Sequence, residues 1–154
     1  MSSWDAVTYA SCRPAWPDLR TGKVIKVYDG DTVTIGTQDM VRHSCRLSGI
    51  DTAELRTRDK VEKARAYASR DFLRSRVMDK IVDITVNGVD KYGRVLCVIS
   101  FEGVNINELM IEKGGAVEYE GGSKPRTNWA NVPAACEAPA SKLGCWGSLR
   151  SLFC

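Results

Sequence analysis

The order in which two hydrophobic periods follow one another most constrains the fold of this chain. Segments in which apolar and polar residues alternate are typical of β-strands with one buried face, and one long stretch has the spacing of an amphipathic helix. The expected strands are residues 22–29, 31–37, 40–48, 81–86 and 95–101. The expected helix spans residues 59–77, between the third and fourth strands, with a buried stripe formed by Val61, Ala64, Ala68, Phe72, Leu73 and Val77.

Two shorter helices are expected after the strands. One spans residues 104–113 and ends at Gly114-Gly115, and the other spans residues 135–143, where Pro139 interrupts it. Five short strands with a helix between the third and fourth are typical of a small closed barrel of OB type. We therefore predict an α+β fold that is mainly β, a five-stranded OB-type β-barrel with one or two C-terminal helices. The length of 154 residues and the hydrophobic content of 44% favour one domain.

Targeting signals are not evident in the sequence. No apolar run is long enough to span a membrane, so no membrane association is expected. The first 20 residues lack a basic region followed by an apolar one, so a signal peptide is not expected and a cytoplasmic location is favoured. An extracellular or periplasmic location is the alternative if the true start differs or a leader has been removed. The formal net charge of +3 permits a polyanionic partner without requiring one.

The cysteine pattern argues against a zinc site. None of the six cysteines forms a CxxC pair, and His43 is the only histidine. Cys45 and Cys97 lie inside expected strands and are predicted to be small core residues. Disulfides among the remaining four would require an oxidising compartment. These four lie in the terminal segments and are Cys12, Cys136, Cys145 and Cys154.

Polar and charged residues gather at the ends of the expected strands. They are Asp29, Asp31, Arg46, the run 51–54 (DTAE), the run 90–94 (DKYGR) and Tyr119. Arg46 lies on the polar face of the third strand, shortly before Asp51 and Glu54. A turn after that strand can place all three at one rim of a barrel, and Asp31 can reach the same rim from the second strand.

This set of residues suits the hydrolysis of a phosphodiester. Clustered carboxylates resist ionisation unless a cation lies among them, and Ca²⁺ takes oxygen ligands from carboxylates, carbonyls and water. Two aspartates and one carbonyl would leave coordination positions open for a substrate. Two arginines beside such a cation indicate an anionic substrate, because the guanidinium group matches a phosphate. A free carboxylate could then orient and deprotonate a water molecule.

Simpler interpretations of the same residues stay open. Asp-Gly-Asp is common in plain turns, and the run 90–94 suits an ordinary hairpin connection. The face of the long helix that is rich in Arg and Lys is interpreted as a solvated surface rather than as a binding patch.

Taken together, the motifs resemble the staphylococcal nuclease (thermonuclease) family. The matching runs appear in the family's order and are VIKVYDGDTVTI (24–35), RLSGIDTAE (46–54), DKYGRVLCVI (90–99), VNINELMIEKGGA (104–116) and LGCW (143–146). The resemblance places a thermonuclease-like OB-fold domain at residues 22–147. Residues 1–21 are then an N-terminal extension and residues 148–154 a C-terminal tail, neither of which has a counterpart in the family.

The resemblance also implies roles for individual residues. Asp31 and Asp51 match calcium-ligating aspartates, and Thr52 matches the position that offers its backbone carbonyl to the same ion. Glu54 matches the carboxylate that positions or deprotonates the attacking water, and Arg46 and Arg94 match the arginines that hold the scissile phosphate. Asp29 matches a neighbouring acidic position and is assigned to the residues around the metal ligands. The alternative is that Asp29 is a plain turn residue with no relation to a metal. Tyr92 and Tyr119 are assigned to nucleotide binding.

The activity implied by the resemblance is Ca²⁺-dependent endonucleolytic cleavage of DNA and RNA. Single strands are preferred, water attacks phosphorus, the 5′-oxygen leaves and the products end in 3′-phosphate. The nuclease is expected to act as a monomer. A non-catalytic module of the same fold that binds nucleic acid or protein is the alternative, and a third interpretation is hydrolysis of some other phosphodiester. Such binding modules typically lose part of the charged set, whereas this sequence keeps all of it.

Some positions depart from the family pattern. Ala53 replaces the proline that usually precedes the catalytic glutamate, which predicts a less rigid loop. Tyr119 lacks a second tyrosine beside it, and Glu118 and Glu120 flank it instead. Tight nucleotide binding is therefore less strongly predicted than hydrolysis of a phosphodiester.

Overall fold

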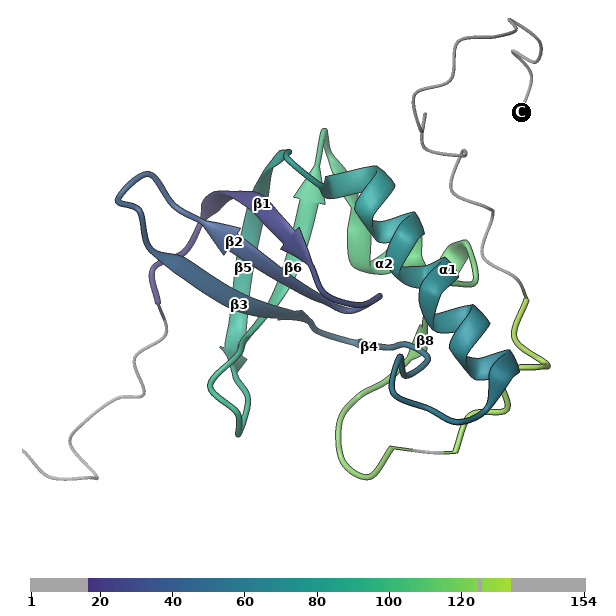
Figure 1. The fold of residues 1–154 in the computed structure, drawn as a ribbon. Helices are drawn as coiled ribbons and strands as arrows, with labels where there is room; N and C mark the ends of the chain where they lie inside the picture. The colour runs from purple at the N-terminus through teal and green to yellow at the C-terminus, as the bar shows by residue number, and fades with distance from the viewer. Residues whose placement is uncertain (1–16, 125, 134–154) are drawn as a thin grey trace, which may run out of the picture.

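A five-stranded β-barrel dominates the computed structural model, which describes residues 17–124 and 126–133. Its strands are β1 (Thr21–Val27), β2 (Thr32–Gly36), β3 (Arg42–Leu47), β5 (Ile81–Val89) and β6 (Val95–Phe101). They form one sheet in the order β3-β2-β1-β5-β6, and a parallel pairing of β3 with β6 closes it into a barrel. The predicted OB-type fold is thereby confirmed, with the long helix between the third and fourth barrel strands (Figure 1).

Two helices and three short strands complete the described chain. Helix α1 (Lys60–Val77) and helix α2 (Ile106–Glu112) lie beside one another against the barrel (Figure 1). β7 (Val104–Asn105) extends the main sheet at β6, whereas β4 (Ile50–Asp51) pairs with β8 (Val117–Glu118) in a separate two-stranded sheet. None of the helices in the described ranges is long and apolar enough to cross a membrane. The helix expected at 135–143 and the four cysteines of the terminal segments lie outside the described residues.

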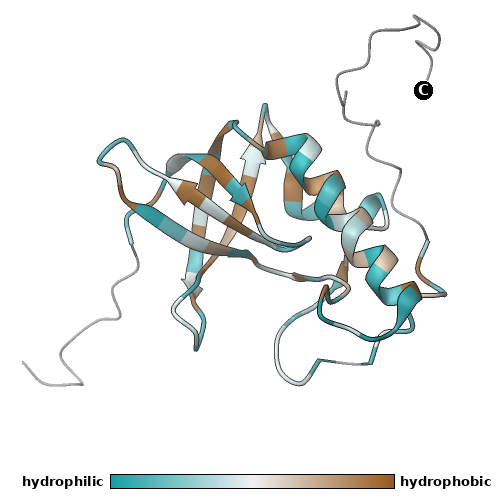
Figure 2. Cartoon of the chain, viewed as in Figure 1, coloured by the Kyte–Doolittle hydropathy of each residue, from teal (hydrophilic) through white to brown (hydrophobic). Residues whose placement is uncertain are grey.

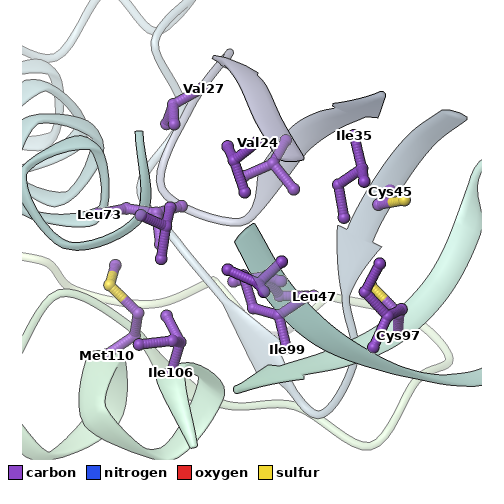
Figure 3. Close-up of a cluster of buried hydrophobic side chains, with 14 of the residues drawn as sticks. Val24, Val27, Ile35, Cys45, Leu47, Leu73, Cys97, Ile99, Ile106 and Met110 are labelled. Atoms are coloured by element: carbon purple, nitrogen blue, oxygen red, sulfur yellow. The ribbon is translucent and has the colours of Figure 1, made fainter. Parts of the chain in front are cut away.

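The core is formed by the inward faces of the strands and by one face of each helix (Figure 3). Val24, Ile35, Leu47 and Ile99 are fully buried, as alternation within the strands predicts. Leu73 contributes to the same core from α1, and further residues contribute from α2 and from the segment before β1, namely Ile106, Met110 and Leu19. Cys45 and Cys97 are free and buried in this core, which confirms their predicted role.

The predicted buried stripe of the long helix was wrong in its first half. Val61, Ala64 and Ala68 are exposed, and the residues of α1 that are buried are Ala66, Ser69, Phe72, Leu73 and Val77. The reason is that the first half of α1 packs on loops rather than on the barrel, so small residues face inward there. Figure 2 shows that hydrophilic and hydrophobic residues alternate along the helix, so hydropathy alone does not mark this buried face.

Smaller differences concern the ends of elements. The fourth strand was expected to end at residue 86, but β5 continues through Asn87 and Gly88, where the pairing with β6 shifts register between Val86 and Gly88. Residues 104 and 105 were expected in a helix and instead form β7, with Asn105 capping α2 through its side chain. The third strand was expected from residue 40, but β3 begins at Arg42, and Val41 before it is exposed.

Candidate active site

The closure of the barrel brings the charged residues together around Arg46. In β3, Arg46 pairs with Thr32 of β2 on one side and with Leu96 of β6 on the other. Asp31 directly precedes β2 and Arg94 directly precedes β6, so both reach the same rim of the barrel. Figure 1 shows the β5–β6 hairpin and the loop after β8 extending from this end. The predicted juxtaposition is therefore present.

The Asp29–Thr32 turn is shaped by a side-chain hydrogen bond and by close packing. The backbone N–H of Asp31 donates to Asp29 Oδ1 at 3.1 Å. Gly30 is buried, and a Cβ added there would lie 2.7 Å from Ser69 Cβ and 2.9 Å from Thr52 Cγ2. Glycine is required at this position because α1 and the segment that follows β4 approach the turn so closely. Asp29 thus has a structural role in the turn, whatever its relation to a metal.

Arg46 lies between two buried aspartates. Its Nη2 donates to Asp31 Oδ2 at 3.0 Å and to Asp51 Oδ1 at 3.3 Å, and all three side chains are at least 90% buried. The hydroxyl of Thr32 donates to the other oxygen of Asp31 at 2.9 Å. Within the described residues, these contacts use only Nη2 of the guanidinium group, so Nε and Nη1 keep N–H donors for an anionic ligand.

Asp31 is held in an environment that disfavours its charge. Burial raises its pKa, and the nearby charge of Asp29 raises it further, whereas the Arg46 guanidinium and the Thr32 hydrogen bond lower it; the net result is a pKa of about 6. A carboxylate in this state is stabilised by any additional cation placed beside it. This is the electrostatic condition expected of a metal ligand before its metal is bound.

The oxygen atoms at the site fit a hard cation. Asp31 and Asp51 supply carboxylates, and Thr52 is a buried residue whose carbonyl comes directly after β4. Such a donor set suits Ca²⁺, which accepts carboxylate and carbonyl oxygens and completes its coordination with water. In the described part of the chain, no three His, Cys, Asp or Glu side chains converge as a metal-binding group. The assignment of Asp31, Asp51 and the Thr52 carbonyl as ligands of one ion stays a prediction.

A lysine that the sequence analysis missed bridges two of the predicted site residues. Lys124 Nζ lies 2.7 Å from Asp51 Oδ1 and 2.8 Å from Glu54 Oε1. Burial alone would lower the pKa of Lys124, but its hydrogen bonds and charge interactions with Asp51 and Glu54 raise it to about 12. Lys124 follows Glu54 by 70 residues, and no local motif marks it, so only the folded chain reveals this contact.

Arg94 is oriented by the hairpin that carries it. Asp90 accepts from the backbone N–H groups of Tyr92 and Arg94 and from Arg94 Nε, the last at 2.7 Å. Partial burial opposes ionisation of Asp90, but these hydrogen bonds outweigh it and lower the pKa of its carboxyl group. Arg94 Nη1 also lies 3.5 Å from the Thr32 hydroxyl, next to Asp31. The DKYGR run is thus both a hairpin connection and the support that points Arg94 toward Arg46.

A cavity of about 240 Å³, which we call the central cavity, joins these groups. It is lined by Asp29, Asp31, Arg46, Thr52, Ala53, Glu54, Tyr92, Arg94 and Lys124. Nearly all the predicted site residues therefore face one space. Asp51 does not line it but forms ion pairs with Arg46 and Lys124, which do, and Tyr119 is the other predicted residue that does not line it.

Both predicted tyrosines border a longer groove of about 770 Å³ that leads away from the central cavity. We call it the tyrosine groove; it is lined in part by Arg46, Tyr92, Arg94, Tyr119 and Lys124. The guanidinium carbon of Arg46 lies 5.7 Å from the centre of the Tyr119 ring, and that of Arg94 lies 5.5 Å from the centre of the Tyr92 ring. Aromatic rings next to cations in a groove provide surfaces on which bases can stack.

The loop that carries Glu54 is anchored at Ala53. Ala53 is 2% exposed and packs in a small cluster with Ala66 of α1 and Trp129. The backbone N–H of Glu54 donates to Glu62 at 3.3 Å. The sequence predicted a less rigid loop because alanine replaces proline, but these contacts supply a restraint that the sequence did not show.

The pKa of Asp31 leads to a prediction for the metal-free protein. Because the folded state raises this pKa from 3.8 to about 6, the folded state binds more protons than the unfolded state between these values. The resulting contribution to stability is therefore present below about pH 4 and is lost as pH rises through about 6, with an upper limit of about 3 kcal/mol. Urea unfolding in EDTA from pH 4 to pH 7 should show wild type losing stability relative to Asp31→Asn. A constant difference between the two proteins would contradict this prediction.

Comparisons with known proteins agree on one family. A family model described as staphylococcal nuclease homologue matches residues 44–148. The chain is 35% identical over 113 residues to an uncharacterized endonuclease of Escherichia coli, covering 69% of this chain and 67% of that protein. It is 33% identical over 105 residues to an uncharacterized endonuclease of Haemophilus influenzae, covering 67% and 54% respectively. A probable endonuclease of Schizosaccharomyces pombe is 29% identical over 120 residues, covering 71% and 52%.

Proposed function

The chain belongs to the family of staphylococcal nuclease homologues, and from this premise we propose that it is a Ca²⁺-dependent nuclease that hydrolyses phosphodiester bonds of DNA and RNA. Cleavage is endonucleolytic, prefers single strands and leaves 3′-phosphate ends. The observation that carries the proposal is the convergence of Arg46, Arg94, Glu54 and Asp31 on the central cavity, with Asp51 paired to Arg46 beside it. In this proposal two guanidinium groups, one carboxylate and a set of oxygen ligands for a hard cation all lie within reach of one phosphate.

Binding of the scissile phosphate is assigned to the two arginines. Arg46 enters the cavity from β3 and Arg94 from the start of β6, so the phosphate lies between them. Each guanidinium group can donate two parallel hydrogen bonds to phosphate oxygens. Because negative charge increases on these oxygens in the transition state, donors fixed in advance stabilise the transition state more than the ground state.

Activation of water is assigned to Glu54. Its side chain is 61% exposed and lines the same cavity, so water reaches it directly. A carboxylate there can accept a proton from a water molecule positioned for attack on phosphorus. A Ca²⁺ ion held by Asp31, Asp51 and the Thr52 carbonyl would supply additional positive charge next to the phosphate. Asp29 keeps the Asp31 backbone in place through the hydrogen bond to its N–H.

Base recognition is expected to be weak. The groups in the central cavity are suited to bind the phosphate rather than the base, and phosphate contacts carry no sequence information directly. Tyr92 and Tyr119 offer ring faces, which accept any base by stacking. The alternative, a binding module without catalysis, is disfavoured because the arginines, the aspartates and the glutamate are all present and converge.

The proposal predicts activity that depends on calcium. Wild-type protein is expected to cleave a labelled single-stranded DNA and a single-stranded RNA in millimolar Ca²⁺, and to stop when EGTA is added. Mg²⁺ alone should support little cleavage, because Mg²⁺ is smaller and requires near-ideal octahedral geometry. Gel electrophoresis before and after phosphatase treatment would identify 3′-phosphate ends. A folded protein that cuts neither substrate in Ca²⁺ would reject the nuclease proposal in favour of the binding module.

A further inference from the structure

A second large hollow adjoins the central cavity through residues that the two share. It has a volume of about 700 Å³ and is lined in part by Thr57, Arg58, Lys124, Arg126 and Asn128; we call it the arginine hollow. The central cavity shares Thr52, Glu54 and Lys124 with this hollow, and it shares Arg46, Tyr92, Arg94 and Lys124 with the tyrosine groove. Among the residues that the structure describes, the groove and the hollow share only Lys124. The three spaces therefore form one path with the central cavity in the middle.

The charged residues of the arginine hollow differ in whether they have partners within the protein. Its acidic residues all accept hydrogen bonds or form ion pairs within the protein. Asp59 Oδ1 accepts from the backbone N–H groups of Val61 and Glu62 at the start of α1. Glu62 accepts from the Thr57 hydroxyl at 2.7 Å and from the Glu54 backbone N–H. The other two carboxylates of the lining, Asp51 and Glu54, share Lys124.

The two arginines differ from these groups. Neither Arg58 nor Arg126 forms an ion pair within residues 17–124 and 126–133, and both are exposed. Arginines that face a hollow without a carboxylate partner leave planar sets of N–H donors for an external anion. The segment that leads into α1 is largely hydrophilic, as Figure 2 shows, so a charged ligand is favoured over an apolar one.

The walls that carry these arginines are ordered by specific contacts. Arg58 immediately precedes Asp59, which caps α1. Arg126 is followed by a turn in which the N–H of Ala130 donates to the Asn128 side chain and the N–H of Asn131 donates to the Asn128 carbonyl. Trp129 in the same turn packs on Ala53, the residue next to Glu54. The hollow is thereby attached to the loop that carries the catalytic carboxylate.

We propose that the arginine hollow is a second polynucleotide-binding subsite, in which Arg58 and Arg126 hold backbone phosphate of the strand segment on the far side of the scissile bond from the tyrosine groove. This inference rests on the proposed nuclease function and extends it. A single strand crosses the site from the tyrosine groove, where bases stack, through the central cavity to the arginine hollow, where phosphate is bound. This division between base stacking and phosphate binding follows from the residues that line the hollow. Trp129 is the one aromatic residue among its described lining residues, and because it is 7% exposed it offers little ring surface for stacking.

The first test measures binding in the absence of cleavage. Arg58→Ala/Arg126→Ala is compared with Arg42→Ala/Arg74→Ala, a control that removes the same charge from exposed positions on β3 and α1 outside all three spaces. Fluorescence anisotropy with a labelled single-stranded 12-mer in EDTA gives the dissociation constant at several salt concentrations. The slope of log affinity against log salt is negative, and its magnitude should fall by about 1.4 in the hollow variant, that is about 0.7 for each lost phosphate contact, and stay unchanged in the control.

The second test locates the contact relative to the scissile bond. A dinucleotide with one phosphodiester bond is cleaved in Ca²⁺ as it stands, with an additional 5′-terminal phosphate, and with an additional 3′-terminal phosphate. In the hollow variant, the increase in kcat/KM that one of these terminal phosphates provides should fall by about tenfold. The increase from the other terminal phosphate, and cleavage of the plain dinucleotide, should stay within about twofold of wild type.

Several results would overturn the inference. An unchanged salt slope in the hollow variant would show that the arginines contact no phosphate. Equal loss on all three dinucleotides would show that they act on the chemistry rather than on the strand. If the wild type cleaves no substrate, the nuclease proposal fails, but the binding measurement in EDTA still decides whether the hollow holds nucleic acid. Circular dichroism melting of both variants establishes that they are folded.

Discussion

Replacement of Glu54 by glutamine is expected to lower the rate of phosphodiester cleavage by about 10²- to 10⁴-fold, the range typical of general acid–base catalysis. The amide has nearly the same shape as the carboxylate but cannot accept a proton from water. Its carbonyl oxygen can still accept from Lys124 Nζ, so that contact is retained. Because the Glu54 side chain is 61% exposed, the fold should be unaffected. Initial rates on single-stranded DNA at saturating substrate would measure the effect.

A matched control for this variant lies on α2. Glu112 is an exposed glutamate whose carboxylate lies 3.3 Å from the ammonium group of Lys113. Glu112→Gln therefore removes the same charge, also beside a lysine, at a site far from the central cavity. We expect this control to cleave like wild type. Wild-type activity in Glu54→Gln would exclude Glu54 as the base and move the search to the other groups of the central cavity.

Replacement of Arg46 by methionine is expected to have the largest effect on stability. Arg46 neutralises Asp31 and Asp51 in a buried cluster, and removing one partner of a buried ion pair typically costs about 3–5 kcal/mol. Lys124 still neutralises Asp51, so we expect a loss near the lower end, about 3 kcal/mol. For a domain of this size the melting temperature should fall by about 10 °C. Thermal and urea unfolding in EDTA would measure the loss.

The cause of that loss can be separated from a general packing defect. If uncompensated charge destabilises Arg46→Met, the additional change Asp31→Asn should recover part of the stability, because it removes one of the two carboxylates. A packing defect would instead give losses that add. Cleavage should also fall about 10²- to 10³-fold in Arg46→Met, since the transition state loses a fixed donor. Full activity with unchanged stability would reject both roles of Arg46.

The stabilising and catalytic roles of Arg46 depend on the same geometry. Its Nη2 holds Asp31 and Asp51 in place, and its remaining N–H groups are available to a phosphate. The site therefore keeps three charged side chains buried in a small barrel, which is unfavourable unless they are mutually compensated. A cation bound beside the aspartates would favour the ionised form of Asp31, whose pKa is raised by burial and by the nearby charge of Asp29. Added Ca²⁺ is thus expected to stabilise the folded protein.

The barrel and most of the site could be predicted from the sequence because their signals are local. Alternation within the strands follows directly from the geometry of a β-strand, so the five barrel strands were located to within a few residues. The DGDT turn and the run 90–94 lie at strand ends, where neighbouring strands meet at a common rim. The roles of Asp31, Asp51, Thr52, Glu54, Arg46 and Arg94 remain predictions, although the structure brings all of these residues together.

Other features depend on contacts between residues far apart in the chain. Helical periodicity did not identify the buried face of the first half of α1, because Ala64 and Ala68 are as apolar as the buried Ala66. The loop after β4 was expected to lack a restraint, but Trp129 packs on Ala53 across a long sequence separation. The pairing of β4 with β8 involves two residues from each strand, too few to produce a periodic pattern.

By itself the sequence determined the order of the five barrel strands and of α1 and α2, the buried cysteines and the family, since each follows from residues close together or from motifs in series. Only the tertiary structure decided that Lys124 joins Asp51 to Glu54 and that Arg58 and Arg126 face one hollow beside the central cavity. The physical reason is that these contacts join β4 and the segment after it to the segment after β8, which the pairing of β4 with β8 brings together. Spacing along the chain carries no information about such contacts.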